Sequence, residues 1–154
     1  MASVHWLTNR GKLELLQGRW DSAGATDIRM GYIQGTARPA AIDTEAEIQD
    51  FNFVVDLLNA TGVDEPTVAN YARMNLDRTN WTEDDTDNRA EADAGNETLS
   101  AVAGGESIIG GFIFRFVTND SDSPLWSVWL LDAPGTATNG SDITATINDL
   151  YRGT

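Results

Sequence analysis

Cysteine is absent from this chain of 154 residues, and several other residue types are scarce. There are four prolines and one histidine, and Lys12 is the only lysine among ten basic residues. Without cysteine the chain can build neither a disulfide framework nor a thiolate metal site. No apolar run approaches the roughly 20 residues that a transmembrane helix requires, and no basic segment precedes a hydrophobic N-terminal stretch. We therefore expect no membrane association, no secretory signal, and one domain over residues 1–154.

Basic residues are few compared with acidic ones. The chain has 24 Asp and Glu against 10 Lys and Arg, a formal net charge of −14 and a sequence pI near 4.1. A surface of this charge repels phosphate backbones, so we expect no nucleic-acid partner. It also repels itself, except in molar salt, where the screening length falls to about 3 Å. Two origins fit this composition: a salt-loving host, or a GC-rich genome combined with an ordinary acidic surface.

Two helices are expected. The first is short and belongs to an N-terminal arm and helix over residues 1–18, with Gly18 as its end. The second lies near residues 45–59, where apolar residues recur at helical spacing between Ile48 and Leu58. The candidate N-caps are Thr8 or Asn9 for the first helix, and Asp43 or Thr44 for the second.

Most of the remaining chain predicts strands. Residues 125–131 are apolar on nearly both faces, which indicates a central strand or a subunit contact, with Trp126 and Trp129 on opposite sides. The polar turn before them favours an antiparallel hairpin. We therefore predict a mainly β fold, an antiparallel sandwich or barrel, with one short N-terminal helix and a second helix near 45–59. The strands expected are residues 26–33, 71–76, 88–94, 108–117, 125–131 and 143–147.

No residue pattern indicates catalysis. His5 is the only histidine, and nothing such as a Gly-X-Ser-X-Gly elbow accompanies it, so a terminal or subunit-contact role is expected. Asp84, Asp85 and Asp87 could chelate Ca²⁺, but they lack the EF-hand spacing and are more typical of a solvated loop. We expect no enzyme activity, no cofactor and no metal site.

Tryptophan is frequent and admits two interpretations. Trp20, Trp81, Trp126 and Trp129 could form a platform on which sugars stack, since aromatic faces with a polar rim suit carbohydrates. Packing in the core or at a subunit interface is the more ordinary use of such residues. The sequence leaves both open, and it favours packing.

Two motifs carry a resemblance to known proteins. The chain opens with Leu7-Thr8-Asn9-Arg10-Gly11-Lys12 before a short helix and a strand, and near its end it has a Thr138-Asn139-Gly140 loop. In this order and spacing it resembles a recurrent group of small virion proteins of tailed viruses. Weaker similarity extends over residues 71–76 and 87–90 and over Ser123-Pro124-Leu125, whereas the tryptophan-rich strand and residues 39–66 depart from the pattern. The resemblance implies a virion structural protein of a phage or haloarchaeal virus, most simply on the head exterior.

These observations favour a non-enzymatic protein that decorates or cements the capsid. Its expected partners are the major capsid protein and copies of itself, forming homo-oligomers in the virion. Two alternatives stay open: a tail tube, collar or fibre-associated subunit, and a host-surface carbohydrate-binding module that depends on Trp20 or Trp81. The residues expected at subunit contacts are His5, Trp6, Arg10, Arg38, Pro39 and Trp129.

Overall fold

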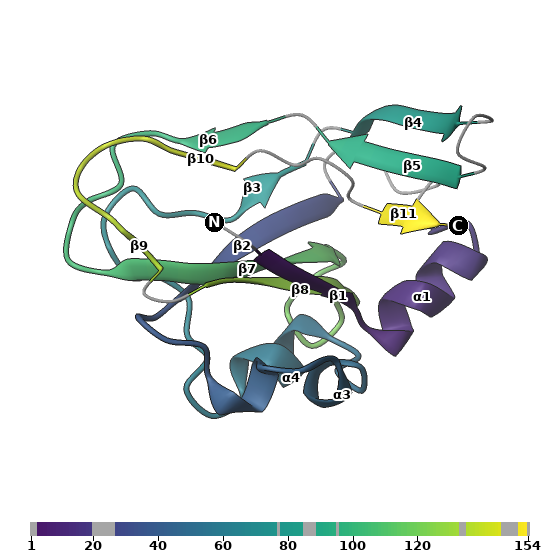
Figure 1. The fold of residues 1–154 in the computed structure, drawn as a ribbon, viewed down its shortest axis with the longest axis horizontal. Helices are drawn as coiled ribbons and strands as arrows, with labels where there is room; N and C mark the ends of the chain where they lie inside the picture. Colours follow the sequence, from purple (N-terminus) through teal and green to yellow (C-terminus); the bar gives the residue numbers. More distant parts are fainter. Residues whose placement is uncertain are drawn as a thin grey trace.

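The computed structural model describes residues 3–19, 27–76, 78–84, 89–94, 96–132, 135–145 and 151–153. Strands in antiparallel sheets dominate this part of the chain, and the few helices are short (Figure 1). The arrangement is sandwich-like and does not close into a barrel. The predicted mainly β, antiparallel fold is therefore confirmed, and the sandwich is the correct form of it.

Within the described residues, the largest sheet has six strands. Five of them follow the order β1-β8-β7-β2-β3, and β9 pairs with the beginning of β7. Every pairing in this sheet is antiparallel. The strands are β1 (Ser3–Leu7), β2 (Ile28–Gln34), β3 (Met74–Asn75), β7 (Ser107–Arg115), β8 (Leu125–Leu131) and β9 (Thr136–Ala137).

Two smaller sheets lie on one side of this main sheet (Figure 1). One pairs β6 (Glu97–Leu99) with β10 (Ile143–Ala145), and the other has the order β11-β5-β4. The bounds of the latter strands are β4 (Arg78–Asp84), β5 (Arg89–Ala94) and β11 (Tyr151–Gly153). β6 and β10 form a second layer, which makes the fold a sandwich.

The main sheet is buried on both faces. One hydrophobic cluster lies between the sheet and the β6–β10 layer, and it includes Met30, Ile113 and Trp126. The other lies on the opposite face and includes Phe112, Phe114 and Val128. β7 and β8 supply side chains to both clusters, which explains why their sequences are apolar with little alternation. The expectation that residues 125–131 form a central strand is confirmed.

The prediction of one continuous second helix near residues 45–59 is wrong. Two helices, α3 (Glu45–Ile48) and α4 (Val54–Leu58), follow the 3₁₀ turn η1 (Ala40–Ile42) and cover the second face of the sheet. Between them the chain turns at residues 49–50 and is extended at Phe53, because its backbone pairs with the start of β8: the Leu125 amide donates to the Asn52 carbonyl oxygen (3.0 Å). Asp56 then accepts hydrogen bonds from the amides of Asn52 and Phe53, so the second helix has its own start. The predicted cap is confirmed at Thr44, whose amide and hydroxyl both donate to Glu47.

The first predicted helix is confirmed as α1 (Asn9–Leu16), with Thr8 as N-cap. Thr8 Oγ1 accepts a hydrogen bond from the Gly11 amide (2.8 Å) and donates one to the Leu125 carbonyl oxygen (2.6 Å). A side chain at Gly11 would overlap the Trp126 carbonyl oxygen, so a glycine is needed where α1 crosses β8. Gly18 ends the helix at φ +66°.

The residues before α1, which we expected to be an N-terminal arm, form a strand. Ser3–Leu7 pairs with β8 over five residues without a bulge and forms the edge strand β1. Its sequence is rich in residues that favour strands, including Val4 and Trp6, but such a short run next to a helix cap gives little periodicity to recognise.

The tryptophan prediction for β8 also needs correction. The pairing of β7 with β8 shifts by one residue, from Ile113 opposite Ser127 to Phe114 opposite Leu125. This irregularity turns Trp126 to the side of the sheet on which Trp129 lies, and both pack in the first cluster. A bulge of this kind reverses a period-two assignment.

The other strands are confirmed in part. Residues 26–33, 88–94, 108–117 and 143–147 were predicted, and strands lie there as β2, β5, β7 and β10. Residues 71–76 contribute only the two-residue β3, and Ala72 is exposed. The sequence pattern did not predict β4, β6 or β9, and it placed Asp84 in a solvated loop, whereas β4 continues to Asp84.

Substitution of Gly111 tests the packing of aromatic rings on β7. A Cβ at this position would lie 2.5 Å from Cζ2 of Trp129 and 2.6 Å from the Gly31 carbonyl oxygen. We expect Gly111→Ala to lower the free energy of unfolding by about 1–3 kcal/mol, because the ring must leave its position. Urea denaturation followed by tryptophan fluorescence measures the change. Gly104→Ala is the control, since its Cβ would meet nothing closer than the Thr138 carbonyl oxygen at 3.2 Å. An equal loss in both variants would contradict the packing argument.

Candidate functional site

His5 and Trp129, two of the six predicted contact residues, lie side by side. They are direct partners in the pairing of β1 with β8, so their side chains share one face of the sheet. His5 keeps access to solvent, and desolvation by neighbouring atoms still lowers its pKa below the usual 6.5. A neutral histidine beside a half-buried tryptophan thus lies at the open edge of the sheet.

Trp129 is held from inside the molecule as well. Its ring lies over Gly111 and meets Tyr32 edge to face, with ring centroids 6.0 Å apart. The ring of Tyr32 in turn lies 6.5 Å from that of Tyr71. A row of aromatic side chains therefore runs across β8 and β2, and only its outer end, at Trp129, reaches the β1 edge.

Trp6 and Arg10, also predicted at contacts, interact with other parts of the structure. Trp6 is half-buried on the opposite face of the sheet, against the cluster beneath α3 and α4. Arg10 forms an ion pair with Glu14 (3.2 Å) on α1 and lies 5.6 Å from the centroid of the Phe53 ring. We predicted that Trp6, Arg10 and His5 all lie at subunit contacts, whereas the structure separates Trp6 and Arg10 from His5.

A buried carboxylate explains the position of Arg10. The Glu14 side chain is only 2% exposed, and Arg115 on β7 binds it through Nε (2.9 Å) and Nη2 (3.3 Å). Two guanidinium groups therefore neutralise one carboxylate between α1 and the main sheet. This cluster fastens α1 to the sheet, and it leaves no free acid for proton transfer.

Arg38 and Pro39 fasten the segment before η1 to the end of β8. Arg38 donates to the Leu131 carbonyl oxygen (3.0 Å) and to Asp132 Oδ1 (2.9 Å), and it lies 3.7 Å from Asp43 Oδ1. Its side chain is 22% exposed, and Pro39 is half-buried. Leu131 pairs with Ser3, so these residues mark the N-terminal end of β1.

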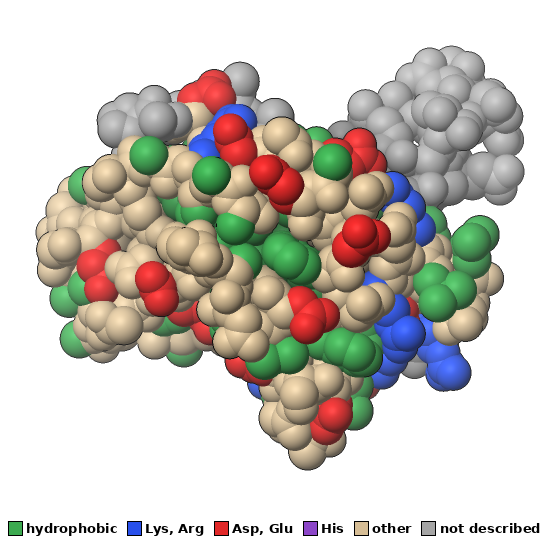
Figure 2. Space-filling view, turned by 90° about the horizontal axis from the view of Figure 1, so that it is seen from below, with side chains coloured by type: hydrophobic (Ala, Val, Ile, Leu, Met, Phe, Trp, Pro, Cys, Tyr) green, Lys and Arg blue, Asp and Glu red, His purple; other side chains and the backbone are tan. Residues whose placement is uncertain are grey.

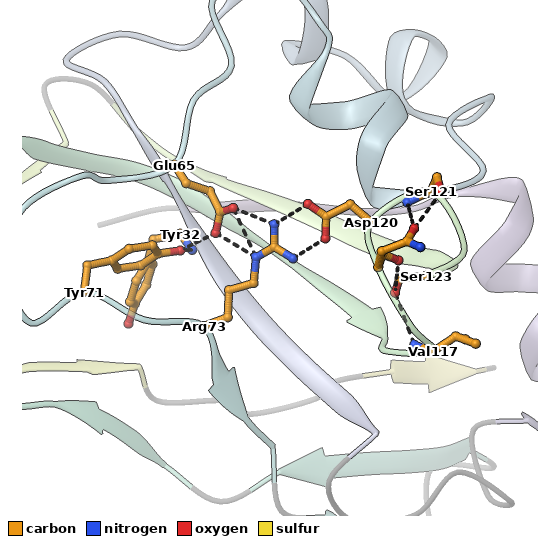
Figure 3. Close-up of polar contacts among 9 residues, drawn as sticks. Tyr32, Glu65, Tyr71, Arg73, Val117, Asp120, Ser121 and Ser123 are labelled. Carbon is orange, nitrogen blue, oxygen red and sulfur yellow. Dashed lines mark hydrogen bonds and ion pairs between the residues drawn. The ribbon is translucent and has the colours of Figure 1, made fainter.

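The sequence pattern did not predict a polar cluster that is formed by the side chains of Arg73, Glu65, Tyr71 and Asp120 (Figure 3). The Arg73 guanidinium binds Glu65 through Nε (3.0 Å) and Nη2 (2.6 Å) and binds both carboxylate oxygens of Asp120. The Tyr71 hydroxyl donates to Glu65 Oε1 (2.6 Å) and accepts the Tyr32 amide (3.0 Å). Glu65, Tyr71 and Arg73 lie in the segment between α4 and β3, whereas Asp120 lies in the loop between β7 and β8, so the spacing of residues near Arg73 could not reveal the whole cluster.

Burial and charge both act on this cluster. Burial alone would lower the pKa of Arg73, but the hydrogen bonds to Asp120 and Glu65 outweigh it and raise the pKa. Burial, followed by the negative charge of Glu65, raises the pKa of Tyr71 well above its usual value. The guanidinium already binds two carboxylates, and its Cζ atom lies 5.2 Å from the Phe114 ring centroid. This arrangement holds the loops together, and its charged groups are bound to one another within the chain.

Some of the other candidate sites involve residues that the structure does not describe, and the described residues give no support for the rest. Trp20, Asp85 and Asp87 lie outside the described residues, as do the side chains of Trp81 and Asp84. In the described ranges no group of three His, Asp or Glu side chains could hold a metal ion, and no helix is long and apolar enough to cross a membrane. Comparison with models of protein families, with curated proteins and with solved structures finds no match to the chain.

Removing Arg73 tests whether the cluster is structural. We expect Arg73→Met to lower the free energy of unfolding by about 2 kcal/mol, because Glu65 and Asp120 then face each other without a cation. The side chains are about one-fifth to one-third exposed, so the loss stays below that of a fully buried pair. Lys12→Met is the matched control: its pair with Glu45 is about half exposed and should contribute less than about 0.5 kcal/mol. Urea titration compares them, and equal effects would contradict the structural role.

The two tyrosines of the aromatic row should respond differently to the loss of a hydroxyl. The Tyr32 hydroxyl is buried with no hydrogen-bond partner among the described residues, so Tyr32→Phe should leave stability at pH 7 unchanged or raise it. Tyr71→Phe removes two hydrogen bonds and should cost about 1–2 kcal/mol. Urea unfolding of both variants at pH 7 is the measurement. A larger loss for Tyr32→Phe than for Tyr71→Phe would contradict the assignment.

Burial of Tyr32 also predicts a dependence on alkaline pH. Burial raises its pKa from 10.0 to about 12, so the folded protein holds this proton more tightly than the unfolded chain does. The resulting stabilisation is complete below pH 10 and is lost as the pH rises through about 12. We expect the stability of the wild type to fall over this window and that of Tyr32→Phe to fall less. Equal slopes in the two proteins would refute the shift.

Proposed function

We propose that this protein is a non-enzymatic structural component of a tailed virus that decorates or cements the capsid exterior through homo-oligomeric contacts. The observation that carries the proposal is the motif Leu7–Lys12, on which the resemblance to small virion proteins rests. Its residues have distinct physical tasks: Thr8 caps α1, Gly11 lets the helix approach β8, and Lys12 reaches Glu45 on α3. The motif thus builds the junction between an edge strand and a helix at the surface.

Further support comes from how the polar side chains are used. Glu14, Arg73 and Arg115 are each bound by opposite charges that hold elements together. Side chains committed in this way suit a rigid building block that many copies can share. In the proposed mechanism, many weak contacts act together by mass action, and the copies bridge neighbouring capsid subunits against internal pressure. The acidic remainder of the surface faces solvent.

Purified virus particles provide the direct test. Antibodies raised against the chain should label intact heads in electron micrographs, and the protein should sediment with the particles in many copies. Labelling of tails would favour the tail-subunit alternative, and so would assembly of the purified protein into tubes or rings. The protein's absence from mature particles would reject the proposal.

The charge of the chain predicts a response to salt, which bears on the salt-loving host. With a net charge of −14, raising KCl from about 0.05 M to about 1 M should increase the free energy of unfolding by about 1–3 kcal/mol. Screening is nearly complete at about 1 M, so the gain should be steep at first and then flatten. Thermal and urea unfolding in a KCl series measure it. A flat or falling response would contradict a surface limited by its own repulsion.

A further inference from the structure

The edge strand β1 lacks the protection that exposed edges usually carry. Natural sheets block their edges with charged side chains, prolines, bulges or very short strands, because an open edge pairs with other chains. β1 has five residues, no bulge against β8, and neither proline nor a formally charged residue. The opposite edge differs, since β3 has only two residues. Among the described strands of this sheet, β1 is therefore the edge strand best suited to pair with another chain.

The helix that follows β1 exposes apolar side chains. Three large hydrophobic residues are exposed in the described part of the chain, and two of them lie on α1: Leu13 (42% exposed) and Leu16 (85% exposed). Basic and hydrophobic side chains gather at the right-hand side of Figure 2, the side on which α1 lies in Figure 1. The α1 end of the β1 edge thus offers apolar contact area next to positive charge.

Charge is divided along the chain in a way that favours a second copy as the partner. Residues 1–20 hold three basic residues and one acid, whereas residues 39–72 hold seven acids and no basic residue. The acidic segment begins at the other end of β1, where Arg38 is bonded to Leu131, the partner of Ser3. Asp43 and Asp132 lie there with about half of each side chain exposed. The Ser3 end therefore carries two half-exposed carboxylates around Arg38, and the α1 end carries Lys12, which is 45% exposed and is paired with Glu45.

We propose that a second copy of this chain docks at this edge, with the two β1 strands antiparallel about a twofold axis. Antiparallel pairing places α1 of one copy beside the Ser3 end of its partner, so Lys12 and Leu16 approach the end that carries Asp43 and Asp132. The same contact is made twice, as an isologous interface requires. Backbone hydrogen bonds continue the main sheet across the axis. The dimer deepens the proposed homo-oligomeric function, although it does not depend on the virus.

Sedimentation of the purified full chain tests the dimer without any capsid. The measurement covers about 1 μM to about 1 mM protein at about 0.15 M and about 2 M KCl, because net repulsion opposes association at low salt. A dimer at either salt, with β1 and α1 amides that exchange hydrogen more slowly as protein concentration rises, supports the proposal. A monomer throughout, or a dimer protected at other elements only, overturns it. Absence from virus particles would reject the proposed function and leave this result unaffected.

Matched substitutions locate the contact. Leu16→Glu should weaken the dimer at least about tenfold, whereas Val117→Glu, at the third exposed hydrophobic residue (46% exposed), should change it less than about twofold. His5 is the middle residue of β1, so the axis brings the two copies of it together; His5→Glu should weaken the dimer at least about tenfold, and His5→Gln should not. Circular dichroism checks that each variant is folded. Equal dimer affinity in all four variants would overturn the assignment.

Discussion

Burial of both faces of β7 and β8 is the constraint on which the rest of this structure depends. These strands lie inside the main sheet and send Ile113 and Trp126 to one side and Phe112 and Val128 to the other. Both faces then need a cover, which the β6–β10 layer supplies on one side and α3 and α4 on the other. The edge strands of the main sheet, including β1, are positioned by this packing on both faces.

Glycine makes room for this packing at a few places. The rings of Phe112 and Trp129 lie where side chains on Gly31 and Gly111 would otherwise be, so small and large residues alternate across neighbouring strands. Gly11 plays the same role between α1 and β8. The aromatic residues and glycines of this chain therefore pack together, and Gly11 sets where α1 crosses β8. An edge that is packed before association suits repeated contact between copies, because little conformational freedom is lost on association.

The sequence predicted the elements whose patterns are local. The predicted strand at residues 108–117, the apolar run 125–131 and the Thr8 cap each depend on neighbours in the chain, and they led to the correct fold class. Long-range effects could not be foreseen: pairing of Asn52 with Leu125 splits the second helix, and a register shift turns Trp126 to the side of Trp129. The same limit applies to the site. The structure places His5 and Trp129 side by side at the β1 edge, whereas Arg10 and Arg38 are bound within the chain, and the Arg73 cluster joins two loops that are distant in sequence.

We propose that the surface formed by β1 and α1 joins copies of this protein on a viral shell. A cryo-electron microscopy map of the intact virus at side-chain resolution tests this claim most directly. We expect the chain on the outside of the head, with β1 against β1 of a second copy and Leu16 covered. A map in which the chain is present with this edge open to solvent, or in which no copy occupies the particle, would contradict it.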